Sequence, residues 1–197
     1  MSDKLTYAGI GSRNTPSKIM DLMYDFAQVL GKLGYTLRTG GAEGADYAFM
    51  AGASAFGSQA EVELYLPWGS FNDWDSSPMV DSSVEVYPQP TPDANWYVDE
   101  YHPNSGSLTS GARKLHARNA HQILGEDLDT PTKMVVCWTP DASLDGTGPE
   151  VGGTGQALRI ASALGIPVLN LANKGHYNFA RWCVDNESLD ESTTFRL

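Results

Sequence analysis

Residues 5–41 read LTYAGIGSRNTPSKIMDLMYDFAQVLGKLGYTLRTGG, and this stretch holds a strand pattern, a helix pattern and a second strand pattern in succession. Short apolar, β-rich runs at 5–10 and 35–38 predict the two strands. From Pro16 onward apolar residues recur at helical spacing, and Gly34 is a typical helix-ending glycine. The stretch is therefore a predicted βαβ unit, which is the building block of a parallel sheet.

The same alternation of short apolar runs and helix-period segments continues along the chain. It predicts strands at 62–66, 133–139 and 167–171, and helices at 45–56, 110–124, 155–164 and 176–184. Right-handed crossovers between five such strands favour an α/β, three-layer Rossmann-like sandwich. Its sheet is expected to be mostly parallel, with strand order 3-2-1-4-5.

The length of 197 residues and the hydrophobic fraction of 41% predict one domain over 1–197 with a substantial core. A long insertion at 67–107 is rich in proline, serine, aspartate and aromatic residues. Its aromatic side chains are open to three interpretations: stacking on a planar ligand, a dimer contact, or a satellite hydrophobic cluster under a loop. These side chains are Trp68, Phe71, Trp74, Trp96, Tyr97 and Tyr101. The polar stretch at 186–197 is expected to be a surface appendage.

The net charge of the chain limits the classes of molecule that it is expected to bind. Lysine and arginine number 13 and aspartate and glutamate 24, so the net charge is −11. This argues against nucleic acid as a partner, because the phosphate backbone is repelled.

The start of the chain is polar and no apolar run reaches the ~18 residues of a membrane helix, so we expect a cytoplasmic protein without a membrane partner. Neither the cysteines nor the histidines have metal-ligand spacing, and we expect no metal and no cofactor.

Three glycine-rich segments each follow a predicted strand. Open α/β sheets bind ligands beyond the carboxyl ends of their strands, so the three segments should converge. In the first, Gly11 allows close approach of the backbone, Ser12 offers a hydroxyl and Arg13 a guanidinium fork for phosphate. Asn14 stands where a third glycine would complete a dinucleotide fingerprint, so that motif is not met.

The second segment, at 39–46, contains Gly40 and Gly41 and again leads into a predicted helix. Glu43 and Asp46 either bond ribose hydroxyls or cap the helix. The sequence leaves both interpretations open.

The third segment, at 148–156, contains Gly152, Gly153 and Gly155 at the start of a helix, with Thr154 and Gln156 beside them. Glycines at a helix N-terminus suit a phosphate cradle, because their amides face the anion. Together the three segments predict a nucleotide or phosphate site at the carboxyl edge of the sheet.

Four motifs in this order carry a family resemblance: GSR at 11–13, TGGAEGAD at 39–46, LHARN at 115–119 and GGTGQA at 152–157. The set resembles the SLOG superfamily of Rossmann-like proteins over about 5–171, apart from the insertion. That superfamily joins the Lonely-guy phosphoribohydrolases to the DNA-processing protein A family. The overall likeness is greatest to small members from bacteria and their phages.

The resemblance implies two activities. Lonely-guy enzymes cleave a nucleotide N-glycosidic bond with an arginine and a glutamate, and Arg118 matches that arginine. Arg159 stands where the glutamate is expected, so a hydrolase would need Glu150 or Glu43 as its acid or base. The DNA-processing family implies single-stranded DNA binding, which the acidic chain fits poorly. Lonely-guy proteins build sites at subunit contacts, so the resemblance also implies a homodimer or larger assembly.

These observations lead to one expected function. The chain binds a nucleotide or nucleotide-derived signalling ligand, as a sensor or sequestering protein. Phosphate is expected on residues 11–13, residues 152–155 and Arg118, ribose near Glu43 or Asp46, and the base under the aromatic insertion. The alternatives are a Lonely-guy-like hydrolase and a single-stranded DNA-binding protein.

Overall fold

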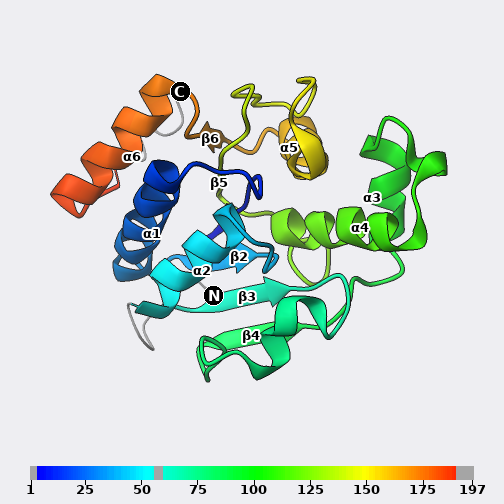
Figure 1. Ribbon diagram of the computed structural model, residues 1–197, viewed down its shortest axis with the longest axis horizontal. Helices are drawn as coiled ribbons and strands as arrows, with labels where there is room; N and C mark the ends of the chain where they lie inside the picture. The colour runs from blue at the N-terminus through cyan, green and yellow to red at the C-terminus, as the bar shows by residue number, and fades with distance from the viewer. Residues whose placement is uncertain (1–3, 56–59, 190–197) are drawn as a thin grey trace.

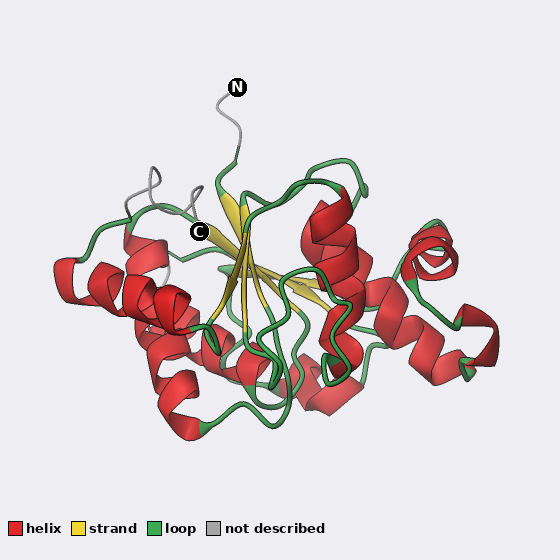
Figure 2. Ribbon diagram, turned by 90° about the horizontal axis from the view of Figure 1, so that it is seen from above, coloured by secondary structure: helices red, strands yellow, loops and turns green. Residues whose placement is uncertain are grey.

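The computed structural model describes residues 4–55 and 60–189, and in it a parallel sheet lies between two layers of helices (Figures 1 and 2). The strands are β1 (Thr6–Gly9), β2 (Thr36–Thr39), β3 (Val62–Tyr65), β4 (Val84–Tyr87), β5 (Met134–Cys137) and β6 (Val168–Asn170). The helices are α1 (Ser17–Lys32), α2 (Ala45–Ala55), α3 (Ala94–Tyr101), α4 (Ser110–Leu124), α5 (Gly155–Ala163) and α6 (Lys174–Asn186). Short 3-10 turns lie at Phe71–Ser76, Ser105–Ser107 and Gly152–Thr154.

The strand order is β4-β3-β2-β1-β5-β6, and every neighbouring pair is parallel. The three-layer α/β prediction is confirmed, and the five predicted strands have the predicted relative order. The predicted strand count was wrong by one, because β4 pairs with β3 at the sheet edge and comes from the insertion. The sheet is all parallel rather than mostly so.

Two apolar cores explain why the strands are continuous apolar runs. In β1, Tyr7 packs with Phe26 of α1 and Phe49 of α2 in one core, whereas Ala8 lies in the other core with Ile123 of α4 and Leu158 of α5. Successive strand residues face opposite sides, so a strand buried on both faces needs apolar residues at every position. Helices α1, α2 and α6 cover one face, and α3, α4 and α5 lie on the other (Figures 1 and 2).

The insertion at 67–107 is mostly ordered into short elements. It contains β4, α3 and two 3-10 turns. Its Phe71 and Trp74 are buried in the α1–α2 core, and Val98 is buried against α4 and α5. Two of the six aromatic side chains named above are therefore core residues, whereas Tyr97 and Tyr101 are partly buried against α4 and α5 and Trp96 is exposed.

The cysteines and the ends of the chain complete the description of the fold. Cys137 and Cys183 are both buried. No helix in the described part of the chain is long and apolar enough to span a bilayer. The predicted tail begins inside α6, and most of it, 190–197, lies outside the described residues, as does the start at 1–3.

Candidate functional site

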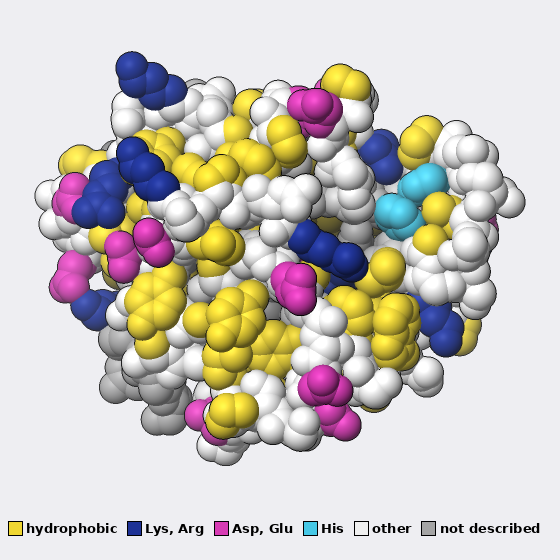
Figure 3. All heavy atoms as spheres, in the orientation of Figure 1, with side chains coloured by type: hydrophobic (Ala, Val, Ile, Leu, Met, Phe, Trp, Pro, Cys, Tyr) yellow, Lys and Arg dark blue, Asp and Glu magenta, His cyan; other side chains and the backbone are white. Residues whose placement is uncertain are grey.

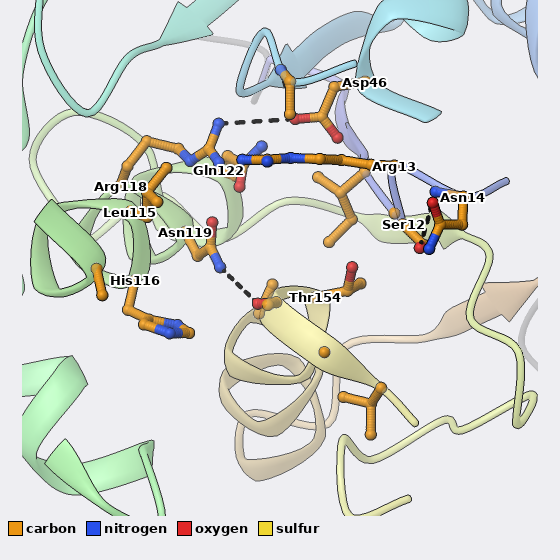
Figure 4. Close-up of a pocket in the computed structure, with 18 of the residues that line it drawn as sticks. Ser12, Arg13, Asn14, Asp46, Leu115, His116, Arg118, Asn119, Gln122 and Thr154 are labelled. Atoms are coloured by element: carbon orange, nitrogen blue, oxygen red, sulfur yellow. Dashed lines mark hydrogen bonds and ion pairs between the residues drawn. The ribbon is translucent and has the colours of Figure 1, made fainter. Parts of the chain in front are cut away.

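A cavity of about 370 Å³ lies at the carboxyl edge of the sheet, between the segment after β1, helix α4 and the turn that leads into α5 (Figure 4). It is lined by residues 10–14, Ala42, Asp46, Ala112, Leu115, His116, Arg118, Asn119, Gln122, residues 150–154 and Ala157. The first and third glycine segments therefore converge, as the sequence predicted. Figure 3 shows basic and histidine side chains close together on the face viewed, to the right of centre.

The first glycine segment is fixed by its backbone. Gly11 has φ of 156°, and a Cβ there would come within 2.8 Å of Ala45 and 3.1 Å of the Trp138 backbone. The amide of Ser12 donates to the carbonyl of Trp138 at 3.2 Å, so the segment is tied to the end of β5. Arg13 follows as an exposed side chain at the cavity mouth, and no acidic group among the described residues forms an ion pair with it.

The second glycine segment contributes less than the sequence predicted. Gly40 and Gly41 do not line the cavity, because the side chains of Arg118 and Trp74 lie against them. Arg118 donates to the Gly40 oxygen, and the indole of Trp74 donates to the Gly41 oxygen at 2.7 Å. Glu43 is exposed and does not line the cavity. These glycines allow Arg118 and Trp74 to pack against the turn.

Asp46 and Arg118 form a buried ion pair in the cavity wall. Asp46 Oδ2 lies 3.6 Å from Arg118 Nη1, and the two side chains are only 4% and 7% exposed (Figure 4). Asp46 Oδ2 also accepts the amide of Ala42 at 3.4 Å, so part of its role is to hold the turn. Burial raises the pKa of Asp46, and the charge of Arg118 opposes that rise.

The third glycine segment forms an open wall of the cavity. A Cβ on Gly152 or Gly153 would meet nothing within 4 Å, although Gly152 has a left-handed φ of 56°. Asn119 on α4 donates to the Gly153 carbonyl at 3.0 Å, which joins the two walls. Gly155 and Gln156 do not line the cavity. Gln156 is buried and donates to the Tyr97 carbonyl of α3 at 2.7 Å.

Unpaired polar atoms gather at this cavity. In the described part of the chain, five buried side-chain N or O atoms have no hydrogen-bond partner. Three of them are His116 Nδ1, Arg118 Nε and Gln122 Nε2, and all three residues line the cavity. Buried polar atoms are normally paired, so this clustering points to a ligand with hydrogen-bonding groups.

A second cavity of about 480 Å³, beside β2, β3 and β4, has a different character. Its charged side chains pair with one another: the buried Arg38 Nε lies 2.7 Å from Glu63 Oε2, and the exposed Lys4 Nζ lies 3.0 Å from Glu63 Oε1. Tyr65 also donates to Glu63 at 2.8 Å. Because these groups already satisfy one another, the smaller cavity is the better candidate site.

Arg159, at the position of the glutamate in the resembled motif, is a structural residue. Its guanidinium donates to the Tyr101 carbonyl at 2.5 Å and to the Gly146 carbonyl at 2.6 Å. It thus joins α5 to α3 and to the loop before the third glycine segment. Glu150 lines the cavity and is exposed, which makes it the one of the two candidate acids that the fold brings to the site.

The aromatic insertion does not cover the cavity. None of its aromatic side chains is among the lining residues. Trp96, Tyr97 and Tyr101 contact one another on α3, with ring centroids 4.9–6.2 Å apart. The planar group that does line the cavity is the imidazole of His116, whose centroid lies 4.5 Å from that of His102.

We expect the partly buried imidazole of His116 to make the free energy of unfolding depend on pH. Burial lowers its pKa to about 4, and the positive charges of His102, Arg159 and Arg118 add to this effect. A histidine in the unfolded chain has a pKa of about 6.5. Between about pH 6.5 and pH 4 the unfolded state therefore binds more protons than the folded state. The free energy of unfolding should therefore fall as the pH drops through this range.

Urea unfolding of wild type and His116→Gln between about pH 7 and pH 5 tests this expectation. The variant should lose less stability on acidification than wild type. Some dependence should remain, because burial also lowers the pKa of His102 and of His121. Identical slopes for the two proteins would contradict the assignment.

Three lining residues were not predicted as ligand-binding residues: His116, Asn119 and Gln122, of which the first two lie in the LHARN motif. Leu115, Arg118, Asn119 and Gln122 are spaced by three, one and three residues on α4, so they lie on one helix face. That spacing from Arg118 was the available signal. No group of three His, Cys, Asp or Glu side chains in the described part of the chain is placed to hold a metal.

Fold and cavity define an α/β protein with a Rossmann-like parallel sheet and a glycine-lined, partly cationic cavity at its carboxyl edge. No family model and no curated protein matches the sequence.

Three solved structures are similar in fold. The Moco carrier protein of Chlamydomonas rheinhardtii is 19% identical with a TM-score of 0.47, over 84% of this chain and 74% of that one. The structural genomics target TM1055 is 17% identical with a TM-score of 0.49, over 96% and 88%. DNA processing protein A from Helicobacter pylori, described with a single-stranded DNA binding mode, is 13% identical with a TM-score of 0.42, over 93% and 82%. The fold assignment rests on this chain's own sheet order and helix layers.

Proposed function

We propose that the cavity binds a nucleotide or a nucleotide-derived signalling ligand, and that the protein acts as a cytoplasmic sensor or sequestering protein. The observation that carries the proposal is the clustering of unpaired donors and an unpaired cation around open glycines. Arg13 has no acidic partner among the described residues, Arg118 Nε has no acceptor, and Gly152 and Gly153 leave space above the start of α5. These groups suit a phosphate ester.

The side chains in and around the cavity favour binding of a nucleotide without cleavage of its glycosidic bond. The Arg159 guanidinium occupies the position where the resembled hydrolases have a glutamate, and it is held by two carbonyls. Asp46 is engaged by Arg118 and by the Ala42 amide. A guanidinium can neither activate water nor stabilise an oxocarbenium-like centre, so the glycosidic bond lacks its usual catalyst.

The test is a thermal-shift screen with mono-, di- and cyclic nucleotides, followed by mass spectrometry of the retained ligand. A ligand at about 100 times its Kd adds about 2.7 kcal/mol, which for a chain of this length raises Tm by roughly 5–10 °C. An intact retained ligand supports a binding protein. No shift with any nucleotide would refute the proposal.

Hydrolysis is the second candidate, and Glu150 at the cavity mouth is the observation in its favour. If the retained material is a free base or a ribose phosphate, Glu150→Gln should abolish its formation. Glu43→Gln is the matched control, because Glu43 is also an exposed glutamate but does not line the cavity.

Salt-sensitive gel shifts with single-stranded oligonucleotides test the nucleic-acid alternative. Sedimentation velocity tests the expected homodimer or larger assembly.

A further inference from the structure

Three residues that line the cavity each have a buried polar atom without a hydrogen-bond partner, and Gln122 is the most deeply buried of the three. It is 2% exposed, and its Nε2 has no hydrogen-bond partner in the described part of the chain. It lies on α4 one turn after Arg118, whose Nε is also buried and unpaired. Gln122 Nε2 and Arg118 Nε are both donor atoms, so they cannot bond to each other.

The side chains of Arg118 and Gln122 lie side by side and both line the cavity. A Cβ built on Gly40 would overlap the Arg118 guanidinium and would lie 2.6 Å from Gln122 Nε2. The side chains therefore converge at the inner end of the cavity, next to Asp46 (Figure 4). The guanidinium fills the point beside Gly40, so a ligand acceptor that receives hydrogen bonds from both side chains would lie on their cavity side.

The local charge favours an anionic acceptor. Asp46 balances the charge of Arg118, but Arg13 lies close enough for its charge to act on Arg118 as well. Arg118 is paired with Asp46, whereas Arg13 forms no ion pair among the described residues, and the other acidic lining residue, Glu150, is exposed. Charge-assisted hydrogen bonds to an oxyanion would satisfy both the charge and the two donors.

We propose that Gln122 is a ligand-binding residue, and that its amide together with Arg118 Nε donates to one anionic oxygen of the ligand at the inner end of the cavity. The inference rests on the proposed function, and it adds the residue that selects an oxyanion at this position. It assigns the inner end of the cavity to an oxyanion and the open glycines at 152–153 to another part of the same ligand.

Two substitutions test the assignment with inorganic phosphate as the probe. Gln122→Met keeps the length of the side chain and removes the donor. It should weaken phosphate binding by about tenfold or more, the usual effect of losing one hydrogen bond to a charged group. It should not lower Tm, because Nε2 has no partner to lose.

Gln122→Glu places an anion at the same point. Its carboxylate should accept from Arg118 Nε and occupy the place of the ligand oxyanion. We expect Tm of the unliganded protein to rise by about 2–4 °C and the phosphate-induced shift to disappear. A structural glutamine would give neither result.

Gln156→Met is the matched control. Gln156 is buried like Gln122, but its Nε2 donates to the Tyr97 carbonyl and it does not line the cavity. This variant should lower Tm and leave phosphate binding unchanged.

The outcomes separate the two proposals. If wild type binds phosphate or a nucleotide and Gln122→Met binds it equally well, the inference is overturned and the proposed function stands. The inference is also overturned if Gln122→Met is destabilised as much as Gln156→Met. If wild type binds neither phosphate nor any nucleotide, the proposed function fails, and the ligand-binding role of Gln122 fails with it.

Discussion

Replacement of Arg118 by methionine is expected to abolish nucleotide binding and to lower the free energy of unfolding by about 3–5 kcal/mol. The loss of stability has a specific cause. Asp46 is 4% exposed at its side chain, and without Arg118 its carboxylate loses its ion-pair partner. The Gly40 carbonyl loses its donor as well. The loss of binding follows from removal of the cation that faces the cavity.

A double-mutant cycle separates the two roles of Arg118. Asp46→Asn in the Arg118→Met background removes the unpaired carboxylate, so the double variant should be more stable than the sum of the single effects predicts. Nucleotide binding should remain absent. Urea unfolding and nucleotide titration of all four proteins measure both quantities.

Arg113→Met is the matched control for Arg118. Arg113 lies on the same helix and pairs with Asp99 at 2.5 Å, but that pair is partly exposed and lies outside the cavity. Its replacement should cost no more than about 1 kcal/mol and leave binding intact. If Arg118→Met bound nucleotide as wild type does, the cavity would not be the ligand site.

The sequence predicts the fold well where local patterns decide it. The segment from Pro16 to Gly34 has a wide apolar stripe and clear end signals, and α1 follows as Ser17–Lys32. Helix α4 matches its predicted bounds because Thr109 caps it by accepting the Ala112 amide and Gly125 ends it. In such segments, local propensity and long-range packing agree.

The edge strand β4 was missed for a physical reason. Its four residues alternate apolar and polar, but they stand among serine, aspartate and proline, and none of them is fully buried. An edge strand hydrogen-bonds to one neighbour only, so its sequence carries a weak signal. What fixes β4 is its pairing with β3, including Tyr87 opposite Tyr65, and that pairing is long-range.

The site shows the same division between local and long-range information. The glycines at 11 and 152–153 line the cavity because strand ends of a parallel sheet meet at one edge. Gly40 and Gly41 also follow a strand, yet side chains from α4 and from the insertion occupy their carbonyls. A glycine-rich turn looks the same in sequence whether it faces a ligand or a packed side chain.

The glycines at the start of α5 allow a direct steric test of where the ligand lies. Gly153→Ala should leave the free energy of unfolding close to that of wild type, because its Cβ would meet nothing within 4 Å and its φ is not left-handed. The added methyl would instead project into the space that the ligand needs. We expect nucleotide affinity to fall by up to about 100-fold, the range for inserting a methyl group into a packed contact.

Two other glycines make the result interpretable. Gly106→Ala adds a methyl at an equally open and exposed position outside the cavity, so it should change neither stability nor binding. Gly155→Ala, two residues along the same turn, would drive its Cβ into Val151 and should lower stability. Isothermal titration with the tightest nucleotide and urea unfolding distinguish these three cases. If Gly153→Ala binds as wild type does, the ligand does not contact the glycine turn. The phosphate would then lie with Arg13, Arg118 and Gln122 alone, and the resemblance of residues 152–157 to a phosphate cradle would reflect only the packing of α5.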